Sequence, residues 1–372
     1  MKILYTTFNT FPSNSANSVH ILNMAMELKK RSQSFVLFVP NRYKCTKLKS
    51  SGLEIDAIDS NIRYGAYTNP QKLGMLFFVF HLLFFSIQYK PDFIICRHIF
   101  SSVLLSFFNK KTFLELHVLP KGSNLLLLKY LKNRNLKLIT ISNVLKNDLK
   151  KIGLDSNVLH DCANIVDDSK IAEVELNGKQ KISVGYVGSA FLGKGVEVII
   201  ELAKKCLDID FYIIGVDFND IPINVSNSFS GNVYFVGRVG NSLVPSYIKL
   251  FDICLLPNQK SVLIGRFFWD DDAHNDANSM DIGKYTSPLK LFEYMAQKKP
   301  IISSNIDSIK EVLLNNKNAL IVESDNIASW EKALYELVNN ESIRKELGLA
   351  AYNTFIDKYT WSKRVDSYIN MV

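Results

Sequence analysis

The chain has 372 residues, of which 47% are hydrophobic and 22% are charged. This length and composition predict a globular protein with enough residues for two domains, and they exclude long disordered regions. The net charge of +8 favours an anionic partner, such as a phosphate-bearing ligand or an acidic membrane surface. Nucleic acid is disfavoured, because the lysines are spread along the chain without a recognition-helix or RNA-binding motif.

The cysteines point to a reducing compartment. All five stand singly in the sequence, without the CxxC spacing of a zinc ribbon and without a disulfide pattern: Cys45, Cys96, Cys162, Cys206 and Cys254. The apolar stretch at the start of the chain turns polar too early for a signal peptide, so we expect a first strand there. The sequence therefore favours a cytoplasmic location.

Strand-like and helix-like segments alternate in two successive sets, which predicts an α/β protein with two doubly wound parallel sheets. The first set has strands at 3–6, 35–39, 93–96, 113–116 and 136–141, and a helix at 20–30. The second has strands at 182–187, 211–214, 233–236 and 253–256, and helices at 196–206, 245–250, 308–314 and 327–338. We expect a first domain at 1–166, a linker at 167–181 and a second domain at 182–351.

Residues 75–87 are almost wholly apolar, with the sequence MLFFVFHLLFFSI. Thirteen residues are too few to span a bilayer as a helix. We expect a buried helix, with a helix lying in a membrane interface as the alternative.

The loop after the strand at 182–187 spaces Gly188 and Lys194 as in a Walker A motif. A P-loop NTPase, however, needs Ser or Thr after the lysine to bind magnesium, and this chain has Gly195. A P-loop NTPase therefore stays an alternative. The acidic stretch at 269–281 is expected to be a solvated loop or a mobile lid, and we expect no metal site.

Residues 286–302 predict a helix followed by a buried strand. Ser287 is expected to cap the helix and Pro288 to take its first position. Lys290 and Glu293 then lie one turn apart on a polar face. Free amides at a helix start bind phosphate, and a carboxylate binds ribose hydroxyls, so a nucleotide site is indicated. The alternative is a surface helix with one ion pair.

The sequence SPLKLFEYMA closely resembles a variant of the donor-site motif of the family 4 retaining glycosyltransferases of the GT-B fold. The resemblance implies two Rossmann-like domains facing a central cleft, with residues 352–372 returning to the first domain. In that family the glutamate matching Glu293 holds the ribose, and amides matching Thr286 to Leu289 face the diphosphate. Lys194 matches a lysine that neutralises the diphosphate, whereas Ser189 and Tyr285 replace an arginine and a glutamate of the family pattern.

Other segments add candidates through the same resemblance. His117 lies in FLELHVLP, which is similar to a segment whose histidine reaches the sugar or the acceptor hydroxyl. The implied catalytic residues are His117, Lys194 and Glu293. The implied donor-binding residues are Gly188, Ser189, Arg238, Tyr285, Thr286, Ser287, Leu289, Lys290 and Glu293. The acceptor-side candidates are Asn17, in a loop similar to the family's first loop, and Arg97 and His98, which follow the strand at 93–96 and are expected to face the same crevice as His117.

We therefore expect a hexosyltransferase-type enzyme that uses a nucleotide diphosphate sugar, with a UDP-sugar favoured over a GDP-sugar, and no metal or other cofactor. The expected acceptor is a hydroxyl of a glycan or lipid-linked glycan of a bacterial-type surface polysaccharide. The basic charge favours peripheral association with the inner membrane face. A non-catalytic nucleotide-sugar or glycan binding subunit on the same fold is a further alternative, because several motif positions are altered.

Overall fold

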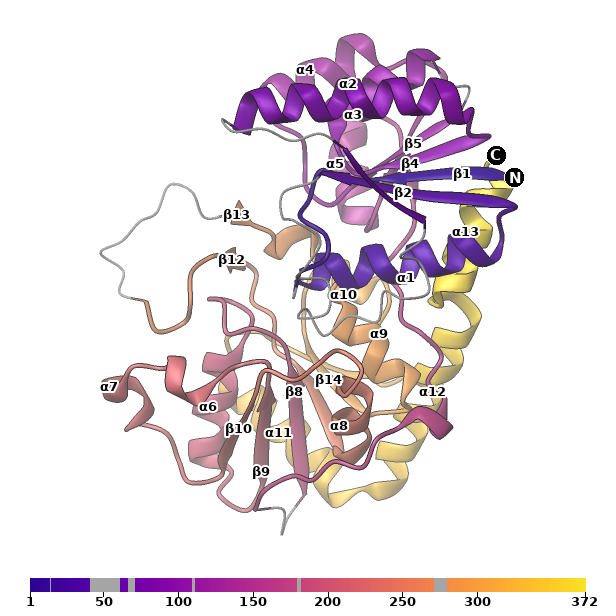
Figure 1. The fold of residues 1–372 in the computed structure, drawn as a ribbon. Coiled ribbons are helices and arrows are strands. Elements are labelled where there is room, and N and C mark those ends of the chain that lie inside the picture. Colours follow the sequence, from indigo (N-terminus) through magenta and orange to yellow (C-terminus); the bar gives the residue numbers. More distant parts are fainter. Residues whose placement is uncertain (14, 41–60, 66–70, 109–110, 179–181, 271–279) are drawn as a thin grey trace. The chain divides into compact units, whose positions relative to one another are not determined.

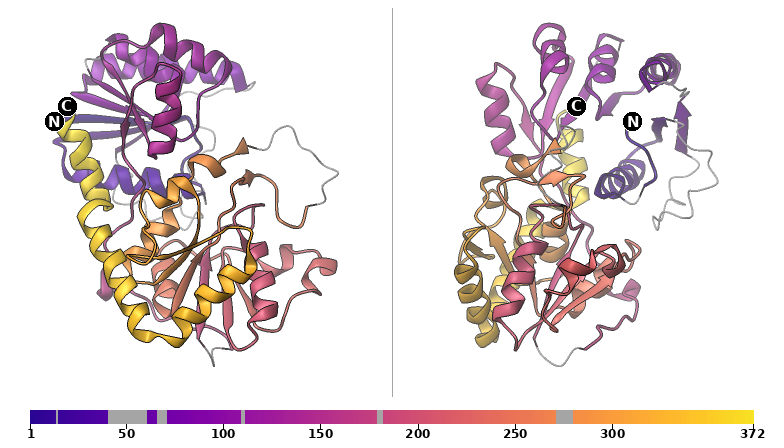
Figure 2. Two further views of the ribbon diagram at one scale, coloured as in Figure 1. Left: turned by 180° about the vertical axis from the view of Figure 1, so that it is seen from behind. Right: turned by 90° about the vertical axis from the view of Figure 1, so that its left-hand side faces the viewer.

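The computed structural model describes residues 1–13, 15–40, 61–65, 71–108, 111–178, 182–270 and 280–372. The chain divides into two compact units. Unit 1 comprises Met1–His160 and Trp361–Val372, and unit 2 comprises Asp161–Thr360. Each unit has a parallel sheet and several helices (Figures 1 and 2).

Unit 1 has a parallel sheet with the strand order β3-β2-β1-β4-β5-β6-β7. Its strands are β1 (Lys2–Thr6), β2 (Ser34–Pro40), β3 (Ile62–Gly65), β4 (Phe93–Cys96), β5 (Thr112–Leu116), β6 (Leu136–Thr140) and β7 (Asn157–Val158). Its helices are α1 (Ala16–Lys30), α2 (Gln71–Tyr89), α3 (Ile99–Phe108), α4 (Gly122–Leu131), α5 (Asn143–Lys151) and α13 (Trp361–Asn370). The strand order changes direction between β1 and β4, and such a switch point opens a ligand crevice at the carboxyl ends of the strands.

Unit 2 repeats this design with the order β10-β9-β8-β11-β14-β15. Its sheet strands are β8 (Ser183–Val187), β9 (Asp210–Ile214), β10 (Val233–Gly237), β11 (Ile253–Leu256), β14 (Ile301–Ser304) and β15 (Leu320–Val322). Its helices are α6 (Val196–Lys205), α7 (Ile223–Ser226), α8 (Val244–Leu250), α9 (Leu289–Ala296), α10 (Asp307–Lys310), α11 (Ile327–Asn339) and α12 (Glu341–Lys358). A small antiparallel pair, β12 (Leu263–Ile264) and β13 (Met280–Asp281), lies outside this sheet. The switch point of unit 2 is between β8 and β11.

Local sequence accounts for these elements. The strands at the sheet centres are apolar on both faces, because helices cover a parallel sheet on each side; in β4 every residue of Phe93–Cys96 is fully buried. Helix α13 buries Trp361, Val365 and Tyr368, which are spaced for one helical face. The sequence prediction of two Rossmann-like parallel sheets is confirmed.

The division between the units differs from the expected boundaries. The change from unit 1 to unit 2 falls after His160, whereas we expected the first domain to end at 166 and a linker at 167–181. The return to unit 1 begins at Trp361, nine residues later than the expected 352. The reason is that α12 continues to Lys358, and its Ala351 and Phe355 are buried in the same apolar cluster as Phe292 of α9.

Candidate functional site

The candidate site of unit 2 lies at its switch point, where β8 ends and a glycine-rich loop leads into α6. Gly193 and Gly195 have φ angles of +81° and +95°, a region that favours glycine. A Cβ atom at Gly195 would lie 2.2 Å from the carbonyl oxygen of Pro257, which follows β11. Glycine at this position therefore lets the loop pack directly on the chain that follows the neighbouring strand.

Lys290, the second residue of α9, reaches this loop. Its Nζ lies 3.6 Å from the ring centroid of Tyr186 on β8, and a Cβ atom added to Gly188 would lie 3.0 Å from the same Nζ. Glycine at 188 thus leaves space for the ammonium group. Lys290 is 7% exposed, and among the described residues its Nζ has no hydrogen-bond partner. A buried ammonium group without a hydrogen-bond partner is costly, so the position suits an anionic ligand.

Lys194 and Glu293 both act on Lys290 electrostatically. Burial lowers the pKa of Lys194 to about 8. Burial, followed by repulsion from Lys194, holds the pKa of Lys290 well below its usual value. Burial also raises the pKa of Glu293 to about 7, although the charge of Lys290 acts in the opposite direction. A diphosphate bound beside the lysines would favour the protonated form of both.

Glu197 was not predicted from the sequence. It lies in the first turn of α6, and its carboxylate accepts a hydrogen bond of 3.1 Å from the backbone N–H of Gly193. Burial raises the pKa of Glu197, and its charge acts on Lys290. The helical pattern offered no signal for it, because Lys194 lies in the loop before α6 and helix spacing does not relate the two residues. Glu197 holds the glycine-rich loop and balances part of the positive charge.

The start of α9 differs from the expectation in two ways. The helix begins at Leu289 with Pro288 as its N-cap residue, and no side chain caps it. The Ser287 hydroxyl instead accepts a hydrogen bond of 3.2 Å from the backbone N–H of Asp161, so the predicted cap was wrong. The expected polar face is also wrong for Lys290, which is buried. The first backbone N–H groups of a helix have no acceptor within it and are available to a ligand.

Three further candidates lie in the segment before α9 and in the loop after β8. Tyr285 ends the short 3-10 helix Gly283–Tyr285, and Thr286 is buried at 5% exposure. Ser189 contributes its carbonyl oxygen, which accepts a hydrogen bond of 2.9 Å from the Tyr186 hydroxyl. These positions therefore belong to the same part of unit 2 as Lys290.

Arg238 is placed differently from the other donor-site candidates. It follows β10, the edge strand, which β9 separates from β8. Its guanidinium forms ion pairs with Asp220 at 2.5 Å and with Asp217 at 3.5 Å, and its side chain is 64% exposed. The structure thus does not bring Arg238 to the switch point with the two lysines.

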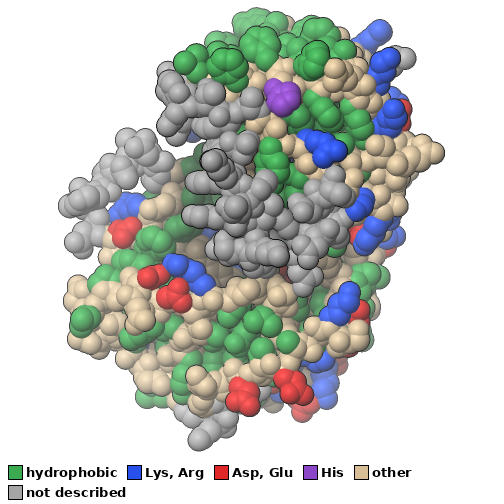
Figure 3. All heavy atoms as spheres, viewed as in Figure 1, with side chains coloured by type: hydrophobic (Ala, Val, Ile, Leu, Met, Phe, Trp, Pro, Cys, Tyr) green, Lys and Arg blue, Asp and Glu red, His purple; other side chains and the backbone are tan. Residues whose placement is uncertain are grey.

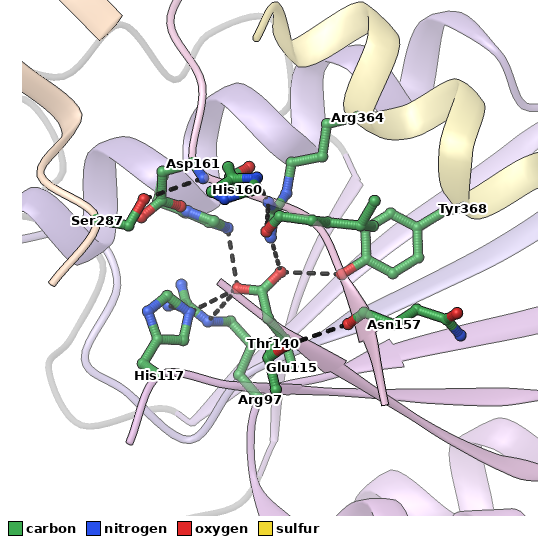
Figure 4. A network of polar contacts seen from close by, with 12 residues as sticks. Arg97, Glu115, His117, Thr140, Asn157, His160, Asp161, Ser287, Arg364 and Tyr368 are labelled. Atoms are coloured by element: carbon green, nitrogen blue, oxygen red, sulfur yellow. Dashed lines mark hydrogen bonds and ion pairs between the residues drawn. The ribbon is translucent and has the colours of Figure 1, made fainter. Parts of the chain in front are cut away.

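In unit 1 the candidates surround a fully buried carboxylate, Glu115 of β5 (Figure 4). His117 Nε2 lies 2.7 Å from Glu115 Oε1 and 2.7 Å from Arg97. On the other side, Arg364 and Tyr368 of α13 donate hydrogen bonds of 2.6 and 2.9 Å to Oε2. His20 adds a contact of 3.1 Å. Glu115 therefore orients His117 and holds the C-terminal helix at the same time.

The basic side chains around Glu115 keep its carboxylate ionised. Burial alone would raise the pKa of Glu115, but the charges of His20, Arg364 and Arg97 outweigh burial and hold it well below its usual range. The carboxylate is thus ionised, and His117, whose side chain is 32% exposed, can face a ligand on its other side. Sequence reasoning found Arg97 and His117 but missed Glu115, although the ELH sequence placed it two residues from His117 on one face of the strand.

The other acceptor-side candidates lie at the switch point of unit 1. Asn17 is the second residue of α1, which follows β1, and its buried Oδ1 has no hydrogen-bond partner among the described residues. His98 follows β4, where its Nδ1 lies 2.9 Å from the Ser101 hydroxyl and its ring stacks on Phe8. Burial lowers the pKa of His98 to about 4, so the ring is neutral. His98 therefore contributes to the packing of unit 1 as a neutral side chain and does not supply a positive charge.

The acidic stretch at 269–281 lies mostly outside the described residues, which resume at Met280. Within the described parts of the chain, no group of three or more metal-binding side chains is found. The carboxylate of Asp281 has a structural role. It accepts hydrogen bonds from the backbone N–H groups of Val262 and Gly283 and from the Ser261 hydroxyl. Its pKa lies below the usual value because these hydrogen bonds outweigh the effect of burial.

Comparisons with known proteins agree with this geometry. Residues 167–354 match the family described as glycosyl transferases group 1. The chain is 25% identical over 239 residues to an uncharacterized glycosyltransferase, MJ1178, of Methanocaldococcus jannaschii, a match that covers 64% of this chain and 59% of that protein. It is 26% identical over 138 residues to TuaH of Bacillus subtilis, a putative teichuronic acid biosynthesis glycosyltransferase, covering 37% of this chain and 30% of TuaH.

Among solved structures, HepE of Anabaena in complex with UDP superposes with a TM-score of 0.72 at 14% identity, covering 100% of both chains. This likeness establishes the GT-B fold that the sequence predicted. The chain spans less than two thirds of the length of the curated relatives that it matches.

Proposed function

Because the chain belongs to the group 1 glycosyl transferases, we propose that it transfers a sugar from a nucleotide diphosphate sugar to a hydroxyl group of a glycan. The observation that carries the proposal is the cluster at the switch point of unit 2. There Lys290 is buried without a hydrogen-bond partner among the described residues, next to Lys194 and Glu293. A buried lysine without a hydrogen-bond partner, a second lysine beside it and one carboxylate match a ligand with a diphosphate and ribose hydroxyls.

The residues of unit 2 then have separate roles. Lys194 and Lys290, with the free amides at the start of α9, bind the diphosphate and stabilise its charge as the bond to the sugar breaks. Glu293 accepts hydrogen bonds from the ribose. Ser189 and Tyr285 are proposed to contact the donor near its sugar. They replace an arginine and a glutamate of the family pattern, so the contacts to the sugar differ from those of the family. Gly188 leaves the space that Lys290 occupies.

The donor is proposed to be a UDP-sugar, and the transfer to retain the anomeric configuration. The UDP-bound HepE structure supports the base, since it shares the fold over the whole chain. The resemblance of SPLKLFEYMA to retaining enzymes supports the stereochemistry. Retention would follow from attack on the face that the diphosphate leaves, without a covalent carboxylate. In unit 1 His117, oriented by Glu115, is the group proposed to contact the acceptor hydroxyl or the sugar.

The acceptor is proposed to be a glycan or lipid-linked glycan of a surface polysaccharide. The similarity to TuaH, a putative teichuronic acid biosynthesis protein, supports this class. The proposal includes a cytoplasmic enzyme that associates peripherally with the inner membrane face. The basic net charge supports that association.

Calorimetric titration with UDP, GDP, ADP, TDP and ATP, each with and without magnesium, tests the donor site. We expect UDP to bind without metal, and Glu293→Ala to weaken its binding by about 1 to 3 kcal/mol through lost ribose hydrogen bonds. Glu201→Ala, an exposed glutamate of α6, is the matched control and should bind UDP as the wild type does. Equal UDP affinity in wild type and Glu293→Ala would contradict the assignment.

The same titration separates the alternatives. A P-loop NTPase would bind ATP with magnesium and lose it on changing Lys194 but not Glu293. The structure weighs against this reading, because Gly195 has a positive φ and no space for the Cβ of the Ser or Thr that a P-loop requires. A non-catalytic binding subunit would bind UDP and yet release no UDP from UDP-glucose in the presence of acceptor glycans.

A further inference from the structure

Helix α2 is apolar on two opposite faces, although only one of them is buried. Its inner face includes Phe78, Val79 and Leu82, which pack against the sheet of unit 1 in one apolar cluster. Its outer face carries large hydrophobic side chains that are 41% to 65% exposed: Leu73, Leu76, Phe77, Phe80, Phe84 and Ile87. At about 100° per residue these six positions form one stripe along the helix. The buried helix expected for 75–87 is therefore buried on one side only.

The exposed stripe continues onto the helices that pack beside α2. Helix α3 contacts both α2 and α4, and the three helices lie together in Figures 1 and 2. Hydrophobic side chains gather over this part of the molecule, at the top of the view in Figure 3. We call the eleven exposed residues the apolar face: Leu73, Leu76, Phe77, Phe80, Phe84, Ile87, Phe107, Phe108, Leu126, Tyr130 and Leu131.

This concentration is unusual for a protein surface. Among the described residues, eleven of the eighteen large exposed hydrophobic side chains belong to these three helices, and the other seven are scattered. Single exposed hydrophobic residues are common and need no explanation, whereas a contiguous set marks an interaction surface. The apolar face therefore calls for a partner.

Charge identifies the kind of partner. Between residues 71 and 135 the sequence has nine lysines and arginines but only two acidic residues, Asp92 and Glu115. Glu115 and one of the nine basic residues, Arg97, are buried as an ion pair in the network of Figure 4, so Asp92 is the acidic side chain of this segment that reaches the surface. Among the described side chains, the basic residues that flank the apolar helices are Lys90 after α2, Lys111 after α3, Lys121 directly before α4, Lys129 within α4, and Lys132 and Arg134 after it.

We propose that the apolar face, with its basic flanks, docks on an anionic lipid bilayer. Aromatic and aliphatic side chains would enter the boundary between head groups and acyl chains, while lysines and arginines bind lipid phosphates. Docking leaves the protein on one side of the bilayer, since no described helix is long and apolar enough to cross a membrane. A second copy of the chain is a poorer occupant, because two basic rims would face each other and repel.

The inference deepens the proposed function by assigning its membrane association to named residues. Only the biological role of this docking rests on the proposed function. Vesicle binding itself requires neither donor nor acceptor. Failure of one is therefore distinguishable from failure of the other. A protein that binds vesicles but not UDP would refute the donor site alone, and the reverse result would refute the docking surface alone.

Vesicle flotation of the full chain tests the proposal. The vesicles are phosphatidylcholine alone or phosphatidylcholine with an equal part of phosphatidylglycerol. We expect flotation with the anionic vesicles, weaker flotation with neutral ones, and a decrease at high salt. The double variant Phe80→Ser and Phe84→Ser should bind about tenfold more weakly, because two aromatic side chains no longer leave water. The control variant Leu207→Ser and Ile223→Ser changes exposed hydrophobic residues of unit 2 and should float as the wild type does.

A charge variant probes the rim separately. Lys129→Glu with Lys132→Glu should lose most of the preference for anionic vesicles, whereas Lys317→Glu with Lys332→Glu, at exposed lysines of unit 2, should keep it. Thermal unfolding and UDP titration of every variant show whether folding and donor binding are intact. Wild-type protein that stays unbound with both vesicle types would overturn the proposal. So would a wild-type dimer in light scattering that Phe80→Ser and Phe84→Ser convert to monomer.

Discussion

Replacing Lys194 with methionine should make the ligand-free protein more stable. The lysine is held in a site built for an anion, and burial lowers its pKa from 10.5 to about 8. That lowering corresponds to about 3 kcal/mol of unfavourable free energy for the protonated form at about 1.4 kcal/mol per pH unit. Lys194 is partly exposed, and its flexible side chain can turn toward solvent, which reduces the cost. We expect Lys194→Met to gain about 1 to 2 kcal/mol of unfolding free energy at neutral pH.

The size of this stability gain depends on pH in a defined way. Below about pH 8 the lysine is protonated in both the folded and the unfolded chain, so the folded state bears the full cost. Between about pH 8 and 10.5 the folded state releases the proton and the cost shrinks, and above 10.5 it is gone. The stability advantage of Lys194→Met should therefore be present at neutral pH and absent at about pH 10.5.

Urea unfolding of unliganded protein, followed by tryptophan fluorescence at both pH values, measures the difference. Lys204→Met removes an exposed lysine of α6 that pairs with Glu201, and it should change stability by about 0.5 kcal/mol or less at either pH. In parallel, Lys194→Met should bind UDP-glucose more weakly than the wild type. A variant no more stable than wild type at neutral pH, or equally stabilised at both pH values, would refute the reasoning that Lys194 is a strained anion-binding group.

Three further predictions concern the same two units. The affinity for UDP-glucose should rise with pH through about 7 as Glu293 ionises and fall above about 8 as Lys194 loses its proton; calorimetry should show the acid limb absent in Glu293→Gln and the alkaline limb reduced in Lys194→Met, where Lys290 still titrates. Gly188→Ala should weaken UDP binding by about 1 to 2 kcal/mol by crowding a buried ammonium group at a positive φ, whereas Gly231→Ala, which meets open space, should not. Glu115→Gln should lower the unfolding free energy by about 3 to 5 kcal/mol, since it leaves buried cations unpaired; a urea midpoint equal to that of the wild type would contradict this.

The sequence predicted those features that depend on residues close together in the chain. The strand predicted at 233–236 is β10 at Val233–Gly237, and the helix predicted at 245–250 is α8 at Val244–Leu250. The glycine-rich loop after β8 and the segment that forms α9 were also found, because each is a continuous motif. Alternating strands and helices were enough to give the two parallel sheets, since a parallel connection requires a crossover helix.

Helix ends were less predictable. The expected cap, Ser287, binds the backbone of Asp161 instead, and the helix expected at 308–314 is the short α10 at Asp307–Lys310. In both cases the structure at the end of the helix differs from the one that the local sequence indicated. Helix ends are the least certain part of a helix prediction, because their terminal residues can bond to other segments instead.

Burial and charge environment were decided by the tertiary structure alone. The sequence gives Lys290 the spacing of a surface lysine, yet the approach of α9 to β8 buries its ammonium group against Tyr186. Likewise, the partners of Glu115 come from α1, from the residue after β4 and from α13, and Arg364 is 249 residues away in the chain. The helix at 71–89 is apolar all round in sequence, and only its position at the surface of unit 1 exposes one face. Local patterns set the secondary structure, because hydrogen bonding and hydrophobic periodicity act over a few residues. Desolvation and charge depend on which distant segments pack together.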